Sequence, residues 1–363
     1  MHVIGDQSRI TCNVEVGFGF RDSARVTLVF GDTKATVAVV EGCGGGLILG
    51  WDSSIVTRRL DVEIEMNEQS EKPDSLPAGR SGTFLLGGEL AVRRLGFGAM
   101  RLTGEGIWGP PKDPDSGRRV LRRSVELGVN FIDTADSYGP YVNEELIAEA
   151  LAPYPADLVI ATKGGWERPG PDQWTHNAGP KHLREAVDGS LKRLRVDRID
   201  VYQLHAPDPV VPFHASVETL AELQAEGKIR FVGLSNVTKE HVERARKIVP
   251  IVSVQNRYSF ADREWDYVLE YCESEGIGSI PWFPLAAGRV AGMVLEKIAN
   301  KRQQTSKQVA LAWLLKRSAV MLPIPGTSSI QHLEENVAAA ALQLSDEEYQ
   351  ELANVPEAAP SRD

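Results

Sequence analysis

Four side chains in the sequence are of types that can deliver a proton together. Asp133 ends an apolar run in "NFIDTADSYG", and Tyr138 follows five residues later, next to a glycine. Lys163 ends the run "LVIATK", and His205 ends the run "IDVYQLH". A tyrosine phenol has a pKa of about 10 and is a poor acid near neutral pH. A neighbouring ammonium group lowers that pKa, so we expect Lys163 to activate Tyr138.

The remaining two groups complete this set if folding brings all four together. Asp133 would hold Lys163 charged and in place, and His205 would donate a hydrogen bond to a carbonyl oxygen. Such a set suits the protonation of an oxygen on which negative charge develops, as reduction of an aldehyde or ketone requires. Taken singly, each residue has a simpler interpretation as a solvated charge, a satisfied core histidine or a loop aromatic. The chemical interpretation therefore depends on the elements that position them.

Short apolar runs alternate with longer amphipathic stretches after residue 82. Buried strands joined by such helices form parallel βαβ units. Eight units over about 260 residues favour an α/β fold of the (β/α)8 TIM-barrel type over an open doubly wound sheet. The expected strands are residues 95–100, 130–135, 158–163, 199–205, 231–236, 252–256, 278–284 and 320–326.

The chain before the barrel has a different composition. Residues 66–82 are polar and contain Pro, Gly and Ser, which predicts a linker. We therefore expect an N-terminal extension with its linker at residues 1–80, and the barrel at residues 81–363. Strand-like runs around "GDTK" predict a small β unit within the extension, but an extension that never folds, or one created by an upstream start codon, fits equally well. After it, "TFLLGGELAVRRLG" predicts a β-hairpin that caps the barrel.

Other polar and aromatic residues are expected at the same rim, because a barrel places its active site at the C-terminal ends of its strands. Ser235, Asn236 and Gln255 carry hydroxyl and amide groups that suit a carboxamide, and Trp282 offers a flat face for a nicotinamide ring. In "PGTSSIQHLEENV" a glycine turn leads into a helix whose backbone N–H groups can bind phosphate. A plain N-capped helix is the simpler interpretation of this last motif.

At this point the chain resembles the aldo-keto reductase superfamily over roughly residues 82–355. The motifs are "GVNFIDTADSYG", "IATKGG", "DVYQLH", "GLSN", "VQNRYS" and "PIPGTSSIQHLEENV". The resemblance implies a barrel closed at its bottom by the hairpin, with Asp133, Tyr138, Lys163 and His205 as a catalytic tetrad. It implies NADPH as the cofactor, with NADH possible, and a substrate pocket at Trp108 and Trp166. The implied cofactor contacts are Ser235, Asn236, Gln255, Trp282, Pro284, Leu285, Arg289, Gly326, Thr327, Ser328, His332, Glu335 and Asn336.

Three positions depart from the family pattern. Gly326 and His332 stand where the family usually has basic residues that hold the 2′-phosphate of NADP. Trp282 stands where Tyr or Phe is commoner. The loops "LGFGAMRLTGEGIWGPP" and "PWFPLAAG" are most similar to the bacterial subgroup that includes pyridoxal reductases.

Bulk properties restrict the setting. A net charge of -10 disfavours a nucleic-acid partner. There is no apolar stretch long enough for a membrane span. The N-terminus does not resemble a secretion signal, and the cysteines Cys12, Cys43 and Cys272 lack metal-ligand spacing. These features predict a cytoplasmic protein without a metal, and we expect a monomer or weak oligomer.

The leading hypothesis is an NADPH-dependent oxidoreductase that reduces small aldehydes or ketones, with pyridoxal as one candidate substrate. The alternative is a cofactor-binding regulatory protein, like the channel β subunits of this family, in which the extension contacts a partner. A (β/α)8 hydrolase or lyase is disfavoured, because the expected metal ligands or paired carboxylates are missing.

Overall fold

The computed structural model describes residues 16–17, 23–30, 33–40, 75–285 and 292–355. The chain divides into two units, Met1–Asn67 and Glu68–Asp363. In the first unit, strands β1, β2 and β3 form an antiparallel sheet in that order. Their bounds are Val16–Gly17, Ser23–Phe30 and Thr33–Val40.

The second unit is built around one parallel sheet. Among the described residues it has seven strands in the order β6-β7-β8-β11-β12-β13-β14, and every neighbouring pair is parallel. The middle strands are buried on both faces, as expected for strands covered by helices. The bounds are Phe97–Gly98, Phe131–Asp133, Val159–Gly164, Ile199–Leu204, Ile229–Ser235, Ile251–Gln255 and Gly278–Ser279.

Backbone hydrogen bonds continue from both edges of this sheet to the eighth apolar run. At the β14 edge, Ser279 N–H donates to Val320 O at 2.8 Å and Leu322 N–H donates to Ser279 O at 2.7 Å. At the β6 edge, Gly96 N–H donates to Pro323 O at 3.0 Å. The eighth run therefore lies between the two edge strands, and the sheet curls around on itself. This is a TIM-barrel-like α/β fold.

Two glycines allow the close approach at this junction. A Cβ atom on Gly98 would lie 2.7 Å from the carbonyl oxygen of Ile324, and one on Gly326 would lie 2.6 Å from the carbonyl oxygen of Gly98. Backbone atoms cannot rotate away as a side chain can, so both positions require glycine in this arrangement.

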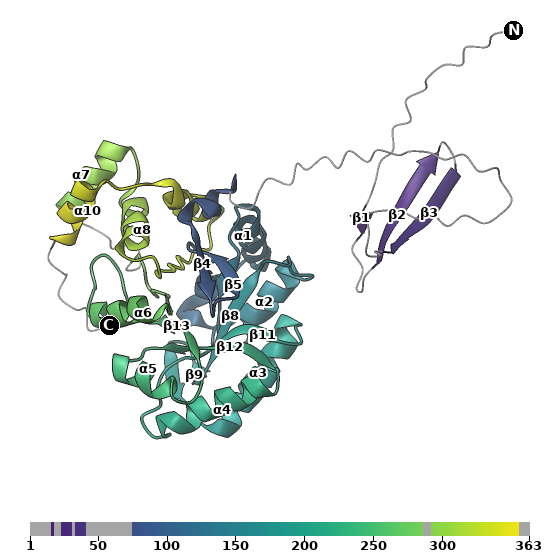
Figure 1. The fold of residues 1–363 in the computed structure, drawn as a ribbon, viewed down its shortest axis with the longest axis horizontal. Helices are drawn as coiled ribbons and strands as arrows, with labels where there is room; N and C mark the ends of the chain where they lie inside the picture. Colours follow the sequence, from purple (N-terminus) through teal and green to yellow (C-terminus); the bar gives the residue numbers. More distant parts are fainter. Residues whose placement is uncertain (1–15, 18–22, 31–32, 41–74, 286–291, 356–363) are drawn as a thin grey trace, which may run out of the picture. The chain divides into compact units, whose positions relative to one another are not determined.

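Helices connect the strands and cover the outside of the sheet (Figure 1). Helix α3 shows why these segments are helical: Pro180 suits its first position, and Leu183, Val187 and Leu194 fall on one buried face. Ser345 caps the last helix, as expected, by accepting from Glu348 N–H. Helices α1 to α5 are Pro114–Glu126, Val142–Leu151, Pro180–Leu194, Phe213–Ala225 and Lys239–Ala245. Helices α6 to α10 are Asp266–Glu275, Met293–Arg302, Ser306–Arg317, Ile330–Ala338 and Asp346–Ala353.

The predicted hairpin is present as antiparallel strands β4 (Thr83–Leu86) and β5 (Leu90–Arg93). Its Leu86 and Val92 pack in one buried cluster with Phe131, which begins β7. The hairpin therefore covers the N-terminal ends of the strands, the opposite end from the predicted site. Within the described part of the chain, no helix combines the length and apolar character needed to cross a bilayer.

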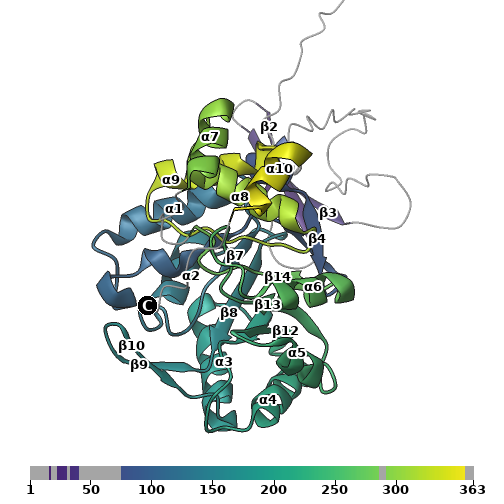
Figure 2. The ribbon, with the colours of Figure 1, turned by 90° about the vertical axis from the view of Figure 1, so that its left-hand side faces the viewer.

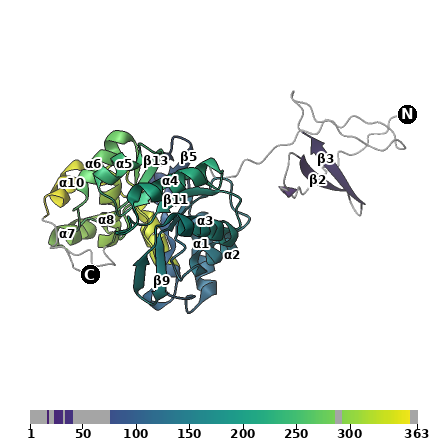
Figure 3. The same cartoon turned by 90° about the horizontal axis from the view of Figure 1, so that it is seen from below.

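The structure differs from the sequence prediction in three elements. The strand predicted over residues 320–326 is present only as an isolated bridge between Met321 and Ser279, although its backbone bonds to both sheet edges. The strand predicted over residues 278–284 is a strand only at Gly278–Ser279, because Pro281 and Pro284 have no N–H to donate to a sheet. An additional antiparallel hairpin, β9 (Trp166–Gly170) and β10 (Gln173–His176), follows β8 and was not predicted. It projects from the body of the barrel (Figures 2 and 3).

Residues assigned to the linker by composition pack against the barrel. The 3-10 turn η2 (Pro77–Ser81) places Ala78 in the main core at 0% exposure. Ala78 N–H donates to Leu127 O at 3.0 Å, and the Ser81 hydroxyl donates to Ala78 O at 2.7 Å. The barrel unit therefore includes residues before the expected boundary at residue 80.

Candidate active site

Three of the four proposed catalytic residues form one buried contact at the C-terminal ends of β7 and β8. Lys163 Nζ donates to Asp133 Oδ1 at 2.6 Å, to Thr134 O at 2.8 Å and to Tyr138 Oη at 3.4 Å. Lys163 is fully buried and Asp133 is 2% exposed. Charges removed from water in this way require partners, and here all three ammonium hydrogens have one.

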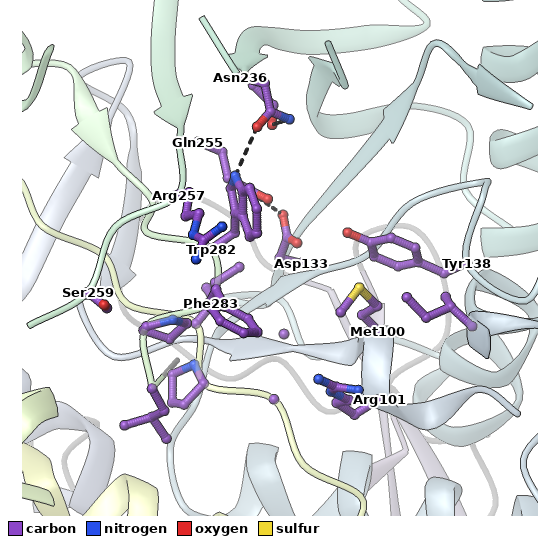
Figure 4. A pocket seen from close by; sticks show the side chains of 18 of the residues that line it. Met100, Arg101, Asp133, Tyr138, Asn236, Gln255, Arg257, Ser259, Trp282 and Phe283 are labelled. Atoms are coloured by element: carbon purple, nitrogen blue, oxygen red, sulfur yellow. Dashed lines mark hydrogen bonds between the residues drawn. The ribbon is translucent and has the colours of Figure 1, made fainter. Parts of the chain in front are cut away.

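Two amides from other strands satisfy the second oxygen of Asp133. Gln203 Nε2 donates to Asp133 Oδ2 at 3.1 Å, and Gln255 Nε2 donates to it at 2.7 Å (Figure 4 shows the bond from Gln255). Gln203 was missed by the sequence reasoning. A signal was available, because Gln203 lies two positions before His205 and side chains alternate along a strand. The carboxylate is therefore held by three donors from three strands.

Burial and charge set the protonation states of this contact. Burial raises the pKa of Tyr138 above its ordinary value, although Lys163 acts in the opposite direction. The electrostatic effect of Lys163 on the Tyr138 pKa thus has the expected direction, but burial outweighs it in this structure. Burial alone would lower the pKa of Lys163, but Asp133 and Tyr138 hold it above its usual value. At neutral pH Tyr138 keeps its proton and Lys163 is charged.

His205 lies beside this contact. Its ring centroid is 5.9 Å from that of Tyr138, with the planes at 81°. Burial, followed by the charges of Lys163 and Arg168, lowers the pKa of His205 well below its ordinary value. The imidazole is therefore neutral, with one nitrogen that donates and one that accepts. Nδ1 lies 3.4 Å from Ser137 Oγ, and a hydroxyl that donates there leaves the proton on Nε2.

A cavity of about 1580 Å³ opens beside these residues, and Asp133, Tyr138 and His205 line it. Lys163 lies behind the wall and does not line the cavity, nor does Trp108. Arg289 falls outside the described residues. The remaining expected cofactor and pocket residues are all in the wall: Trp166, Ser235, Asn236, Gln255, Trp282, Pro284, Leu285, Gly326, Thr327, Ser328, His332, Glu335 and Asn336.

The residues expected to meet a carboxamide form a polar network in the wall. Asn236 has a left-handed backbone, φ 56°, which asparagine tolerates better than most residues. Its Nδ2 donates to His205 O at 2.9 Å and to Ser235 Oγ at 3.1 Å. Its Oδ1 accepts from Trp282 Nε1 at 3.1 Å (Figure 4). This network fixes the Trp282 indole next to the catalytic set.

Three basic residues in the cavity wall were not predicted from the sequence: Arg101, Arg257 and Lys307. Arg101 lies close to Gly326, which has no side chain. The Cγ of Arg101 would be 3.6 Å from a Cβ atom placed on Gly326. Arg257 directly follows the motif "VQN", and Lys307 lies in the first turn of α8. These three positions lie far apart in the sequence, so only the fold shows that they line the same cavity.

The unpredicted hairpin supplies a second aromatic surface, which we call the hairpin wall and define as Trp166, Trp174 and His176. All three residues line the cavity. The Trp166 and His176 rings stack with centroids 3.8 Å apart, and Trp166 meets Trp174 edge to face at 6.0 Å. Trp174 lies 6.3 Å from His205. Sequence reasoning found Trp166 alone, because it did not predict the hairpin.

The arrangement can orient a carbonyl group and give it a proton. Tyr138 holds the proton, His205 offers an N–H, and the charge of Lys163 stabilises negative charge on the phenol. No cluster of side chains in the described residues could hold a metal ion.

Comparison with known proteins gives a consistent assignment. The model of the Aldo/keto reductase family matches residues 94–357. An uncharacterized oxidoreductase of Schizosaccharomyces pombe is 49% identical over 280 residues, which cover 77% of this chain and 91% of the relative. Pyridoxine 4-dehydrogenase of Escherichia coli is 45% identical over 275 residues, 74% of this chain and 96% of the relative.

A solved structure is similar as well. The aldo-keto reductase from Klebsiella pneumoniae in complex with NADPH has a TM-score of 0.65 and 28% identity, and the match covers 77% of this chain and 97% of that one. The family match, the identities with the two relatives and the similar solved structure all support the same family assignment. The chain belongs to the aldo/keto reductase family and is an oxidoreductase.

Proposed function

We propose that this chain is an NADPH-dependent reductase of small aldehydes or ketones in which Tyr138 is the proton donor. The observation that carries the proposal is the buried contact of Tyr138, Lys163 and Asp133 beside His205, on the wall of a cavity of about 1580 Å³. That volume exceeds the usual size of small-molecule pockets, roughly 300–1,000 Å³, and leaves room for a dinucleotide with a substrate.

Each residue has one task in this proposal. A nicotinamide bound in the cavity would supply the hydride. His205 orients the carbonyl oxygen through its N–H, and Tyr138 passes its proton to that oxygen as charge develops. Lys163 favours the phenolate that remains and thereby offsets part of the effect of burial on the Tyr138 pKa. Ser235, Asn236 and Gln255 would hold the carboxamide, and Trp282 would stack on the ring.

Cofactor preference follows from the charges of the residues that line the cavity near Gly326. Gly326 offers no side chain to a 2′-phosphate and His332 offers less charge than lysine or arginine. Arg101 and Lys307 line the same cavity and supply positive charge from other elements. We therefore propose NADPH as the preferred cofactor, with weaker discrimination against NADH than in relatives that have a basic residue at position 326. The Klebsiella pneumoniae structure with NADPH supports this choice.

Pyridoxal is a specific candidate substrate. The relative named pyridoxine 4-dehydrogenase shares 45% identity with this chain over 275 residues. The loops that suggested the pyridoxal reductase subgroup lie within residues 94–357, which match the family model. The aromatic hairpin wall is compatible with a flat pyridine ring.

The test is steady-state oxidation of NADPH and of NADH by the purified full-length protein with pyridoxal, methylglyoxal and 4-nitrobenzaldehyde. We expect turnover of at least one aldehyde and a higher kcat/KM with NADPH. Tyr138→Phe is the control for catalysis at this site. Tight NADPH binding without turnover of any carbonyl compound would favour the regulatory alternative, and a strong preference for NADH would overturn the cofactor assignment.

A further inference from the structure

A single arginine joins the hairpin wall to the turn that carries Tyr138. Arg168 lies on β9 and is 8% exposed. Its guanidinium donates four hydrogen bonds to backbone carbonyls. The acceptors are Gln173 O at 2.8 Å, Gly106 O at 2.8 Å, Ile107 O at 3.0 Å and Ser137 O at 3.1 Å.

These acceptors come from three separate segments. Gln173 belongs to the same hairpin, and Gly106 and Ile107 belong to the 3-10 turn η4 (Glu105–Ile107). Ser137 directly precedes Tyr138, and its hydroxyl lies 3.4 Å from His205 Nδ1. A planar guanidinium can serve four acceptors in fixed directions, whereas an ammonium has three hydrogens on one atom. Arg168 thus fixes the hairpin relative to the residues proposed to meet the carbonyl.

The same guanidinium supports the aromatic rings. Its Cζ lies 3.8 Å from the centre of the Trp174 ring, so the guanidinium covers one face of that indole. Trp166, Trp174 and His205 lie 6.0–6.3 Å apart in each pair, with planes at 80–88°. Three mutually perpendicular rings in contact form a rigid corner beside the cavity. Aromatic rings pack on one another in such edge-to-face and offset arrangements, with a gain beyond their area burial.

We propose that Arg168 is a positioning residue for the hairpin wall, and that this wall selects aldehydes whose carbonyl is attached to a planar aromatic ring. The proposal rests on the reductase function proposed above. Arg168 does not reach the reacting atoms; it acts through Trp174 and through the backbone of Ser137. A flat ring gains contact with the corner of perpendicular rings, whereas a puckered saturated ring of the same size gains only apolar area.

Two aldehydes test the selection directly. Benzaldehyde and cyclohexanecarbaldehyde carry rings of equal carbon number, one flat and one puckered. We would measure kcat and KM for both with NADPH in wild type, Arg168→Lys and Trp174→Leu. Comparing the ratio of kcat/KM between variants cancels the different intrinsic reactivities of the two carbonyls. A failure of Arg168→Lys to fold would leave no activity to measure in that variant. Trp174→Leu is therefore a second test, because this variant keeps Arg168 and its four hydrogen bonds to carbonyls.

Arg263→Lys is the matched control. Arg263 also lies over an indole, 5.2 Å from the centre of the Trp313 ring, and it does not line the cavity. It also donates to three backbone carbonyls, those of Phe260, Ala353 and Val355. The control therefore removes an arginine with similar contacts from a different part of the fold.

We expect both wall variants to lower the benzaldehyde to cyclohexanecarbaldehyde ratio by about two- to tenfold, the factor that corresponds to one aromatic contact. The loss should appear mainly as a higher KM for benzaldehyde, since the contact exists before and during the reaction. NADPH affinity, measured by cofactor fluorescence, should stay unchanged, and Arg263→Lys should keep the wild-type ratio.

Three results would contradict the proposal. Equal losses for the two aldehydes in both wall variants would show a general effect on folding or on the tetrad. A change of the ratio in Arg263→Lys as large as in Arg168→Lys would show that the wall is not the cause. Wild-type protein that turns over neither aldehyde, nor any of the other carbonyl compounds, would overturn the reductase function itself and this proposal with it.

Discussion

Replacing Lys163 with methionine should reduce both stability and turnover, for reasons that can be separated. Methionine retains the apolar stem but removes the ammonium that donates to Asp133, Thr134 and Tyr138. The side chains of Lys163 and Asp133 are 0% and 3% exposed, so water cannot take the place of the missing donor. Asp133 is left as a buried charge with only the amides of Gln203 and Gln255.

The size of the stability loss follows from that geometry. Removing one partner of a buried ion pair costs about 3–5 kcal/mol, and the two remaining amides favour the lower end of that range. A loss of about 3 kcal/mol corresponds to a decrease in Tm of roughly 5 °C for the barrel unit Glu68–Asp363, since its unfolding entropy is about 0.6 kcal/mol/K. The double variant Lys163→Met/Asp133→Asn also removes the stranded charge, so it should recover most of the stability.

Turnover should not recover in the double variant. Neither variant has an ammonium beside Tyr138, so kcat should fall by at least about 10²-fold in both, within the range of general acid catalysis. Thermal unfolding followed by circular dichroism gives Tm, and NADPH oxidation with the best aldehyde of the panel gives kcat. Arg193→Met is the control, because Arg193 forms a partly buried ion pair with Glu144, Nε to Oε2 at 2.7 Å, and neither residue lines the cavity. It should lose stability and retain kcat. A double variant whose kcat returns with its Tm would refute the role of Lys163 in the chemistry.

Tyr138→Phe should lower kcat by about 10²–10⁴-fold while NADPH binding, titrated by fluorescence, stays nearly unchanged; a variant that keeps more than a few per cent of the rate would show that another group is the proton donor. Glu348→Gln should destabilise the protein at pH 7. Hydrogen bonds from Arg302 lower the pKa of Glu348 to about 2, so the carboxylate contributes stability above its unfolded pKa of about 4.3 and loses that contribution as the pH falls toward 2. Urea unfolding across that range should show the difference between the two proteins shrinking, and a constant difference would contradict the argument. A chain that begins at Glu68 should match the full-length turnover rate, whereas one that begins at Ser81 lacks the buried turn η2 and should melt at a lower temperature; equal melting temperatures would show that η2 contributes nothing to the barrel.

The sequence was sufficient to place the catalytic candidates because each one is tied to the end of an apolar run. Asp133 and Lys163 end strands that pair directly, so their proximity follows from strand order alone. Gln203 shows the limit of this reasoning. It bonds to Asp133 across 70 positions of sequence, and its strand position relative to His205 indicates only which face it occupies, not which carboxylate it meets.

The hairpin wall was missed for a different physical reason. "WERPGPDQWTH" reads as a loop because of its prolines and glycine, and its strands pair with each other rather than with the barrel sheet. The order of this segment depends on Arg168 bonds to distant carbonyls, which no local pattern contains. The net direction of the Tyr138 pKa was missed in a similar way, because burial depends on the packing of the whole fold while the neighbouring lysine can be read from the sequence.

The close contact of Gly98 with Gly326 limits the mutational routes open to this protein. The shortest route to stricter cofactor choice is a lysine or arginine at position 326, but its Cβ would meet the Gly98 carbonyl oxygen at 2.6 Å. That oxygen belongs to strand β6, so relief would require a shift of the sheet closure itself. A single substitution there should therefore destabilise the protein before any benefit to binding is gained. Directed evolution of cofactor choice should instead accumulate changes at other residues of the cavity wall, such as Arg101 and Lys307, and leave position 326 untouched.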